Sequence, residues 1–394
     1  MTERLYYEQT SLREFDATVT GLREADSGLC MVSLDRSAFY PTSGGQPFDT
    51  GVLSDGKNEY PVTDVSTDPE GEVWHLVSAG LSVGDRVHGR IDWERRFDHM
   101  QQHGGEHMLA GAIWEKLGGL TIGLHLGKDM STIDVTFPDG RVHVTADEIA
   151  MLEDTVNIRI QQNDPVRCWF PSEQELARLP LRKPPTVTEH IRIVAFGDYE
   201  MVACGGTHPS RTGEIGCIRI LSVTPARGKA RFAFVCGMRA VRLNRMTAAA
   251  VNETGTLLSV PQEGIPQAVV SLKEKIRELS EELKRFQTES LLQQLKAGTE
   301  ILEDGIRLST AWMEDGTSEA LTAAVQKTVR NEKTIALAGM AGRIVFARSA
   351  DLTPDMAKLI RETGKGGGRP EMATGAGNAE CIGKAAEIIR RQHQ

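Results

Sequence analysis

The sequence predicts an α+β protein with a small N-terminal β-barrel, a second α+β domain, a helical linker and a C-terminal α/β domain. Three observations lead to this expectation. Short strand-like segments separated by turn signals fill the first 95 residues, helical and strand-like segments alternate after them, and an apolar heptad pattern occupies 265–286. The length of 394 residues fits two to three domains if a domain has about 150 residues.

The composition is that of an ordinary globular protein, because 40% of the residues are apolar and 25% are charged. No run of about 18 apolar residues is present, so no transmembrane helix is predicted, and the acidic N-terminus lacks the apolar segment of a secretory signal. Six widely separated cysteines predict reduced thiols in a cytoplasmic protein. A net charge of −9 argues against non-specific nucleic-acid binding but allows a local basic patch.

The first predicted domain covers residues 1–95. Its strand-like segments are short and its turn signals are frequent, which is typical of a small barrel or sandwich. The segments are 17–19, 30–32 and 73–77, and the turn signals lie at 54–56, 68–71 and 83–85.

The second predicted domain covers residues 96–247 and mixes helices with strands. Asp92 or Asp98 could cap a first helix that ends at Gly118. Prolines between 165 and 185 predict a loop or a crossing segment. The other expected elements are a strand region at 120–137, a helix at 146–162, and strands at 190–196, 217–223 and 231–236.

A helical linker is predicted over 248–298. Its apolar residues recur in steps of four and three, as in the a/d seam of a coiled coil. Two interpretations remain open: a coiled-coil linker or dimerisation arm, or one helix packed on its own domain. A homodimer would form through 265–290 or through the C-terminal domain, and an antiparallel partner helix within the same chain is the alternative to a dimer. The seam residues are Ile265, Val269, Leu272, Ile276, Leu279, Leu283 and Phe286.

The C-terminal domain, 299–394, has an α/β pattern. Apolar segments at 335–339 and 344–347 precede a helix at 354–363, a glycine-rich loop is expected at 364–377, and a last helix follows.

Two pairs of residues have the chemistry and spacing of metal ligands. His103 and His107 are four residues apart on the first predicted helix, so both imidazoles share one face. Cys204 and His208 flank two glycines that permit a tight loop. Thiolate and imidazole ligands favour zinc over calcium or magnesium. Glu106 precedes the second histidine, so the H-E-x-x-H pattern of a metalloprotease is absent.

The segment 37–51 is rich in glycine, proline and hydroxyl residues. It has no lysine and no following helix, so it is not a P-loop. It is either a plain loop or a backbone-rich wall that a ligand approaches closely, with hydrogen bonds from Ser37, Thr42, Ser43 and Gln46.

These motifs together resemble the editing domain of alanyl-tRNA synthetases and its free-standing AlaX relatives. The resemblance rests on Ser37-Ala-Phe-Tyr-Pro with Gly44-Gly-Gln-Pro47, on His103 and His107, and on Cys204-Gly-Gly-Thr-His208. The segment 364–377 resembles the glycine-rich signature of the DHH-associated domain that ends alanyl-tRNA synthetases. The likeness covers nearly the whole chain, without a preceding aminoacylation core.

The resemblance implies a trans-editing hydrolase that deacylates mischarged tRNA(Ala), chiefly seryl-tRNA(Ala) and also glycyl-tRNA(Ala). It implies zinc held by His103, His107, Cys204 and His208. Ser37 stands where the family usually has the threonine that senses the serine hydroxyl, and Gln46 is a pocket residue.

Basic residues indicate where tRNA could bind. The stretch 211–245 contains eight lysines and arginines, with Glu214 as its one acidic residue. Contacts with tRNA phosphates are predicted for Arg227, Lys229 and Arg231, and for Lys365 and Arg369 near the glycine-rich segment. A solvated basic face is the alternative for both groups.

Two other functions fit the same residues. A non-catalytic tRNA-binding module would use the zinc structurally, since four protein ligands make a closed tetrahedron. Editing of the threonyl-tRNA synthetase type would use a similar His and Cys-His pattern on another aminoacyl ester.

Overall fold

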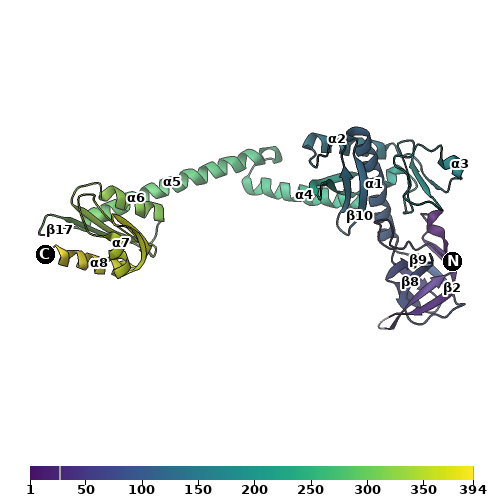
Figure 1. Cartoon of the computed structure of the whole chain (residues 1–394), viewed down its shortest axis with the longest axis horizontal. Coiled ribbons are helices and arrows are strands. Elements are labelled where there is room, and N and C mark those ends of the chain that lie inside the picture. Colours follow the sequence, from purple (N-terminus) through teal and green to yellow (C-terminus); the bar gives the residue numbers. More distant parts are fainter. Residues whose placement is uncertain (26–27, 394) are drawn as a thin grey trace. The chain divides into compact units, whose positions relative to one another are not determined.

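The computed structural model describes residues 1–25 and 28–393. The chain divides into an N-terminal unit, Met1–Ala250, and a C-terminal unit, Val251–Gln394, and Figure 1 shows the elements of each. No helix in these described ranges is long and apolar enough to cross a membrane. Both units contain helices and strands, which confirms the α+β class.

A seven-stranded antiparallel sheet at the start of the N-terminal unit confirms the barrel expected there. Its strand order is β6-β5-β9-β2-β3-β8-β7. The outer strands β6 and β7 are separated in the chain only by Thr63, so the sheet nearly closes on itself. Alternate side chains, such as Phe15, Ala17 and Val19, fill its interior. The strands are β2 (Glu14–Glu24), β3 (Leu29–Leu34), β5 (Gly51–Ser54), β6 (Glu59–Val62), β7 (Asp64–Thr67), β8 (Val73–Ser78) and β9 (Arg86–Ile91).

Helix α1 (Trp93–Leu117) runs through the core of the N-terminal unit. Asp92 caps it by accepting a hydrogen bond from the Arg95 N–H, and Gly118 ends it with a φ of 66°. Of the two possible starts, Asp92 is therefore the one used. Every residue from 99 to 113 is buried, so this helix can place polar side chains out of contact with water.

Two smaller sheets surround α1. The region 120–137 forms a hairpin of two strands, and the helix expected at 146–162 is α2 (Ala146–Gln161), which begins with a capping box between Thr145 and Glu148. The expectation of a loop at 165–185 is partly wrong, because this segment contains β12 (Val166–Trp169) and α3 (Glu173–Leu176). β12 has only four residues and is held in place by its pairing with β13. The nearby prolines hide this short strand in the sequence pattern.

The four-stranded sheet has the order β10 (Leu120–Leu126), β11 (Ser131–Thr136), β16 (Lys229–Cys236), β15 (Ile218–Ala226). The three-stranded sheet has the order β12, β13 (Ile193–Phe196), β14 (Glu200–Ala203). Short pieces complete the unit: β1 (Glu3–Arg4), which pairs with β4 (Arg36–Ser37), and the 3-10 helices η1 (Leu5–Tyr7) and η3 (Thr212–Ile215).

Helix α4 (Gly237–Leu258) contains the boundary between the units, and η4 (Gln262–Gly264) leads into α5 (Ile265–Ala297). The C-terminal unit has a six-stranded sheet in the order β17-β18-β19-β20-β22-β21, with a parallel β18–β19 pair joined through α6. Its elements are β17 (Thr299–Ile301), β18 (Arg307–Met313), α6 (Ser318–Thr328), β19 (Thr334–Met340), β20 (Arg343–Arg348), α7 (Met356–Thr363), β21 (Lys365–Arg369), β22 (Met372–Ala376) and α8 (Ala379–Gln392).

The glycine-rich segment 364–377 is a hairpin, so the expectation of a loop there is wrong. β21 and β22 pair through their backbones, which needs no apolar alternation. A Cβ on Gly366 would lie 2.4 Å from the Thr374 carbonyl oxygen. The glycine is therefore required by the close approach of the two strands.

Candidate metal centre

Two histidines of α1 face the same side of the helix. His103 and His107 are one turn apart, and their rings stack with centroids 5.0 Å apart and an angle of 14° between planes. Both side chains are at least 95% buried, at 3% and 5% exposure. The helix thus presents two imidazoles to one point inside the unit.

The segment that follows β14 supplies the other two side chains. Cys204 lies directly after β14, and His208 is fully buried four residues later. Gly206 passes so close to α1 that a Cβ would lie 2.1 Å from Cε1 of His103. Glycine at this position lets the loop bring its cysteine and histidine to the helix.

The four predicted ligands converge. Cys204 Sγ lies 3.4 Å from His103 Nε2 and 3.3 Å from His208 Nε2, and ligand atoms of all four residues lie within 4.8 Å of one another. A tetrahedral ion with zinc-like bond lengths separates its ligand atoms by roughly 3.4 Å. The four side chains could therefore hold one metal ion.

Unpartnered atoms in the cluster fit a bound ion. Both ring nitrogens of His107 are buried without a hydrogen-bond partner among the described residues, as is Nδ1 of His208. Buried polar atoms almost always have a partner, so such orphans need an explanation. An ion at the centre would partner one nitrogen of His107 directly.

Burial keeps these groups uncharged. It lowers the pKa of His103 to about 3 and the pKa values of His107 and His208 well below their usual range. It also raises the pKa of the Cys204 thiol to about 11. Neutral imidazoles are already in the form that binds metal, whereas the thiol must lose its proton. One sulfur and three nitrogens are compatible with zinc.

Gln46 fixes the orientation of the first ligand. Its Oε1 accepts hydrogen bonds from His103 Nδ1 at 2.8 Å and from the Thr207 N–H at 3.2 Å. Its Nε2 donates to Thr207 Oγ1 at 2.8 Å. Because the proton sits on Nδ1, Nε2 of His103 is left free to face Cys204 and a metal ion. The sequence analysis assigned no role to Thr207. Its position inside the Cys-His motif is the signal that could have indicated one.

Arg192 supports the loop and was not found from the sequence. Its guanidinium donates to the carbonyl oxygens of Cys204 and Gly206, both at 2.9 Å, and to that of Tyr7 at 3.1 Å. The side chain is 3% exposed. No local pattern marks this arginine, because its three partners are carbonyl groups that any residues could supply.

Ser37 lies in the interior of the barrel. Its hydroxyl is 2.8 Å from His75 Nε2, and its oxygen accepts from the Phe39 N–H at 3.1 Å. His75 Nδ1 is 3.0 Å from the Val32 carbonyl, so Nδ1 carries the proton and the Ser37 hydroxyl donates to Nε2. Burial lowers the pKa of His75 to about 4, which keeps this ring neutral. None of these bonds joins Ser37 to the metal cluster.

Glu106 is buried next to the cluster. Its Oε2 lies 3.6 Å from His107 Nδ1, and burial raises the pKa of Glu106 to about 7.

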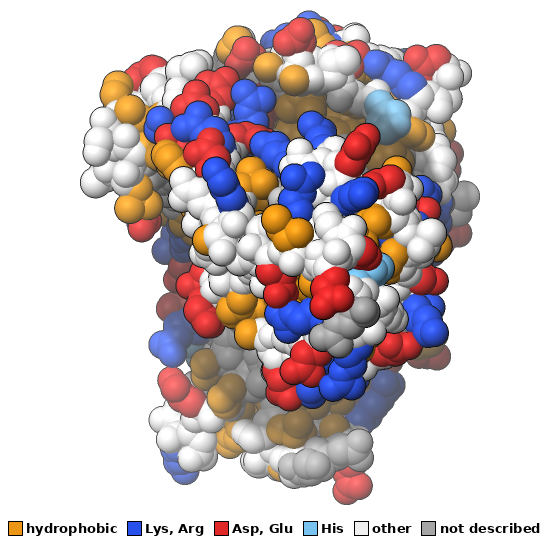
Figure 2. All heavy atoms as spheres, turned by 90° about the vertical axis from the view of Figure 1, so that its left-hand side faces the viewer, with side chains coloured by type: hydrophobic (Ala, Val, Ile, Leu, Met, Phe, Trp, Pro, Cys, Tyr) orange, Lys and Arg blue, Asp and Glu red, His pale blue; other side chains and the backbone are white. Residues whose placement is uncertain are grey.

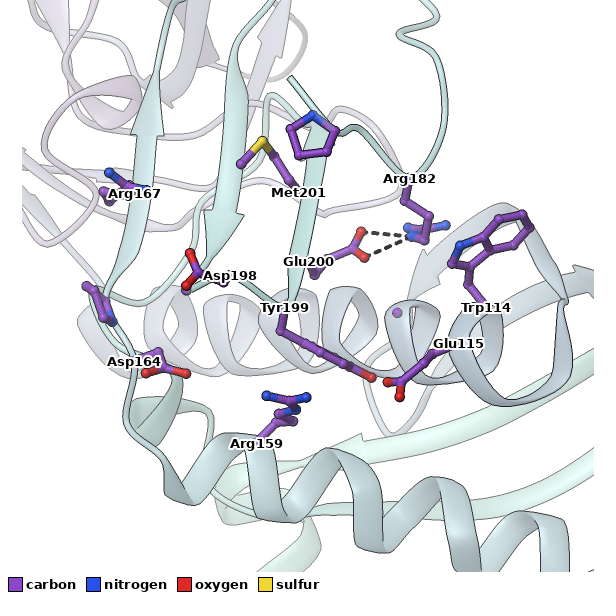
Figure 3. Close-up of a pocket in the computed structure, with 14 residues that line it drawn as sticks. Trp114, Glu115, Arg159, Asp164, Arg167, Arg182, Asp198, Tyr199, Glu200 and Met201 are labelled. Atoms are coloured by element: carbon purple, nitrogen blue, oxygen red, sulfur yellow. Dashed lines mark hydrogen bonds and ion pairs between the residues drawn. The ribbon is translucent and has the colours of Figure 1, made fainter. Parts of the chain in front are cut away.

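Further along α1, a pocket of about 820 Å³ opens beside Gly111 and Trp114. Figure 3 shows Arg182 meeting Glu200 there, with Tyr199 extending toward Glu115. No cluster residue is among the described residues that line this pocket, so it is separate from the metal centre.

A second cavity, of about 960 Å³, lies at the first turns of α1. It includes His99, one turn before His103, and Pro47, the neighbour of Gln46. Trp93 and Phe97 stack in its wall with ring centroids 5.8 Å apart. This cavity therefore adjoins the residues that surround the first metal ligand.

Most arginines of the stretch 211–245 are neutralised by acids from other elements. Glu214 is the one acidic residue within the stretch, and the acids that pair with these arginines come from distant parts of the chain. In one of these ion pairs, Arg231 Nε lies 2.7 Å from Asp134 Oδ1. The remaining pairs are Arg219 with Glu153, Arg239 with Asp98, and Arg242 with Glu94.

Other predicted tRNA contacts remain without an acidic partner. Arg227 and Lys229 lie at the tip of the β15–β16 hairpin, and Lys365 and Arg369 lie on β21. None of the four takes part in an ion pair with the described residues. On the face of the C-terminal unit in Figure 2, Lys and Arg side chains are interspersed with Asp and Glu. The surface there is mixed rather than uniformly basic.

Two family models match parts of the chain. Residues 2–95 match the model of tRNA synthetases class II (A). Residues 191–231, which include Cys204 and His208, match the model of the threonyl and alanyl tRNA synthetase second additional domain. The two matches fall on the barrel and on the segment that completes the cluster.

Known proteins align over nearly the whole sequence. The alanyl-tRNA editing protein AlaX-L of Pyrococcus horikoshii is 32% identical over 420 residues, covering 100% of both chains. The alanine–tRNA ligases of Pyrococcus furiosus and Methanoculleus marisnigri are 33% and 32% identical over 99% of this chain. The chain spans 43% of the length of each ligase.

Proposed function

Because the chain belongs to the family of AlaX alanyl-tRNA editing proteins, we propose that it deacylates mischarged tRNA(Ala) in trans. The preferred substrate is seryl-tRNA(Ala), with glycyl-tRNA(Ala) as a second one. The observation that carries the proposal is the convergence of His103, His107, Cys204 and His208 in a chain that aligns end to end with an editing protein. A substrate from the aminoacyl-tRNA pool makes the cytoplasm the expected compartment.

The proposed cofactor is Zn²⁺, held by these four side chains. Their sulfur and nitrogen donors favour zinc over calcium and magnesium. When bound, zinc supplies positive charge that polarises the ester or places the substrate beside the cluster.

The chain's own residues hold this centre in place. Gln46 keeps the proton of His103 on Nδ1, and Arg192 ties the carbonyl oxygens of the Cys-His loop together. Both side chains are buried, so the arrangement is set before a substrate binds. We assign Gln46 a positioning role through His103.

Selection of serine follows from the cost of unpaired polar groups. A pocket built for alanine cannot strongly reject serine, whereas a site that hydrogen-bonds the extra hydroxyl can select it. The sensing role of Ser37 stays a prediction. Its hydrogen is used by His75 and one lone pair by Phe39, which leaves one lone pair to accept a substrate hydroxyl.

The tRNA would be held through its phosphates and its single-stranded end. Arg227, Lys229, Lys365 and Arg369 are the proposed phosphate contacts, because they have no acidic partner, while Arg231 would have to exchange Asp134 for a phosphate. The cavity at the start of α1 offers Trp93 and Phe97 for stacking of terminal bases.

One observation favours a second candidate function. Four protein ligands complete a tetrahedron, which is the arrangement of structural zinc sites. A tRNA-binding module without hydrolytic activity would therefore have the same cluster. In that case zinc would stabilise the fold and the aminoacyl ester would remain intact.

A comparison of substrates tests these alternatives. We expect single-turnover deacylation of seryl-tRNA(Ala) to be far faster than that of alanyl-tRNA(Ala), with mischarged seryl-tRNA(Thr) as the substrate that tests threonyl-type editing. If seryl-tRNA(Thr) is cleaved and seryl-tRNA(Ala) is spared, the assignment to the alanine system is wrong. If no ester is cleaved faster than in buffer while tRNA(Ala) still binds, the binding module is the correct reading.

A further inference from the structure

His99 is a buried histidine whose Nδ1 has no hydrogen-bond partner among the described residues. It lies on α1 one turn before His103, and its side chain is only 5% exposed. Buried polar atoms are almost always hydrogen-bonded in folded proteins, and an unpaired one costs free energy. The orphaned nitrogen is therefore a reason to search its surroundings for a ligand site.

The ring of His99 is neutral. Burial lowers the pKa of His99 to about 4, and the charge of Arg95 acts in the same direction. A neutral imidazole has one N–H that donates and one bare nitrogen that accepts. It has no charge to attract a phosphate or a carboxylate, so the group that it fits best is a hydroxyl, which can donate or accept.

His99 lies in the wall of the cavity of about 960 Å³ at the first turns of α1. Among the described residues of this wall, Gln101 is the other buried polar side chain. Its Nε2 already donates to the carbonyl oxygen of Glu214 at 2.9 Å. His99 is therefore the buried polar group of the wall that has hydrogen-bonding capacity left for a ligand.

The cavity adjoins the metal centre at this point. Pro47 lines the cavity, and the neighbouring Gln46 accepts the hydrogen bond from His103 Nδ1 at 2.8 Å. Along the helix axis, His99 is about 6 Å from His103, since the two are four residues apart. A substrate whose ester lies at the cluster and whose terminal nucleoside occupies the cavity would have to pass His99.

Building on the proposed function, we propose that the imidazole of His99 holds the free hydroxyl of the terminal ribose of the aminoacyl-tRNA. This hydroxyl and the esterified oxygen are on adjacent ribose carbons, so an ester at the cluster brings the hydroxyl to the same part of α1. The hydrogen bond would fix the ribose, and with it the ester, against the cluster. His99 binds the substrate and takes no part in breaking the ester bond.

Removal of the hydroxyl from the substrate tests the contact. Seryl-tRNA(Ala) that ends in 2′-deoxyadenosine carries serine on the 3′ oxygen and lacks the neighbouring hydroxyl. Its single-turnover deacylation is compared with that of the normal substrate, for the full-length wild type and His99→Leu, both loaded with zinc. The wild type should lose about five- to tenfold more rate than His99→Leu, the value of one hydrogen bond. The effect of the hydroxyl on the reactivity of the ester itself is common to both proteins and cancels.

Three variants serve as controls, and each should keep the zinc content of the wild type. Gln102 is buried on α1, bonds to the backbone of Cys236 and is not among the described residues that line the cavity. Gln102→Leu should therefore respond to the missing hydroxyl as the wild type does. His99→Asn keeps an amide near the position of Nδ1, and His99→Gln keeps one near the position of Nε2. One of the two should recover the response that His99→Leu loses.

A binding measurement separates this inference from the proposed function. The probe is the serine amide of 3′-amino-3′-deoxyadenosine, which has no ester to hydrolyse, together with its 2′-deoxy form. The wild type should bind the first about five- to tenfold more tightly than the second, whereas His99→Leu should bind both equally.

The two proposals fail in different ways. Absence of deacylation by the wild type refutes the proposed function, and the amide then decides the role of His99. If removal of the hydroxyl has the same effect on the wild type and on His99→Leu, in deacylation or, without deacylation, in amide binding, the contact is overturned and His99 is a structural residue.

Discussion

Replacement of Gln46 by leucine should weaken metal binding by roughly 10–100-fold, the usual effect of removing a group that orients a metal ligand. The change removes three hydrogen bonds, to His103 Nδ1, to the Thr207 N–H and to the Thr207 hydroxyl. It leaves two buried donors unpaired. The expected loss in binding free energy is about 1.4–2.8 kcal/mol, at 1.4 kcal/mol per tenfold change.

The assay is competition for zinc against a chromophoric chelator of known affinity. Gln46→Glu is the conservative variant, because its carboxylate still accepts from both donors, and it should retain zinc. Gln102→Leu is the matched control. Gln102 is equally buried on α1 and bonds to the backbone of Cys236 at 2.8 and 3.0 Å, away from the cluster.

The control separates orientation from general destabilisation. Gln102→Leu should lower the free energy of unfolding without changing zinc affinity. If Gln46→Leu folds and binds zinc within twofold of the wild type, the hydrogen bond to His103 does not orient a ligand, and the reasoning is refuted.

Three further predictions concern the cluster and the core around it. Gly206→Ala should abolish zinc retention, because the new Cβ would lie 2.1 Å from Cε1 of His103. Gly205→Ala should retain zinc, because the nearest atom to its Cβ, the Tyr7 hydroxyl oxygen, is 3.8 Å away. Metal analysis of both variants decides this. Zinc affinity should rise about tenfold per pH unit between about pH 6 and 9, because burial raises the pKa of Cys204 to about 11 and one proton leaves on binding; a flat profile in calorimetry contradicts this. Arg96→Met should lower the free energy of unfolding, measured in urea, by about 3–5 kcal/mol, since it leaves the fully buried carboxylate of Asp49 without its ion-pair partner. A loss below about 1 kcal/mol contradicts the importance of this buried ion pair for stability.

Local patterns in the sequence were enough for the elements that carry the site. The spacing of His103 and His107, with Asp92 before them and Gly118 after them, predicted a helix with two ligands on one face, and the structure has both features. The two glycines of the Cys-Gly-Gly-Thr-His motif predicted a tight loop. In each case the information lies within a few residues of the chain.

The features that the sequence could not predict depend on distant partners. The hydrogen bonds of Arg192 go to backbone carbonyls, which no residue type announces. The acid that neutralises Arg231 is Asp134, 97 positions away. The hairpin at 364–377 is held by backbone pairing between glycine-rich strands, so apolar alternation gave no sign of it.

The most direct test of the proposed function is single-turnover deacylation of seryl-tRNA(Ala) by wild type, Cys204→Ala and Cys217→Ala, with zinc measured in each preparation. Cys217 lies outside the cluster and is the matched cysteine control. We predict one zinc per chain and rapid deacylation for wild type and Cys217→Ala, and loss of both for Cys204→Ala. Undiminished deacylation by a zinc-free Cys204→Ala variant would contradict a metal-dependent editing site.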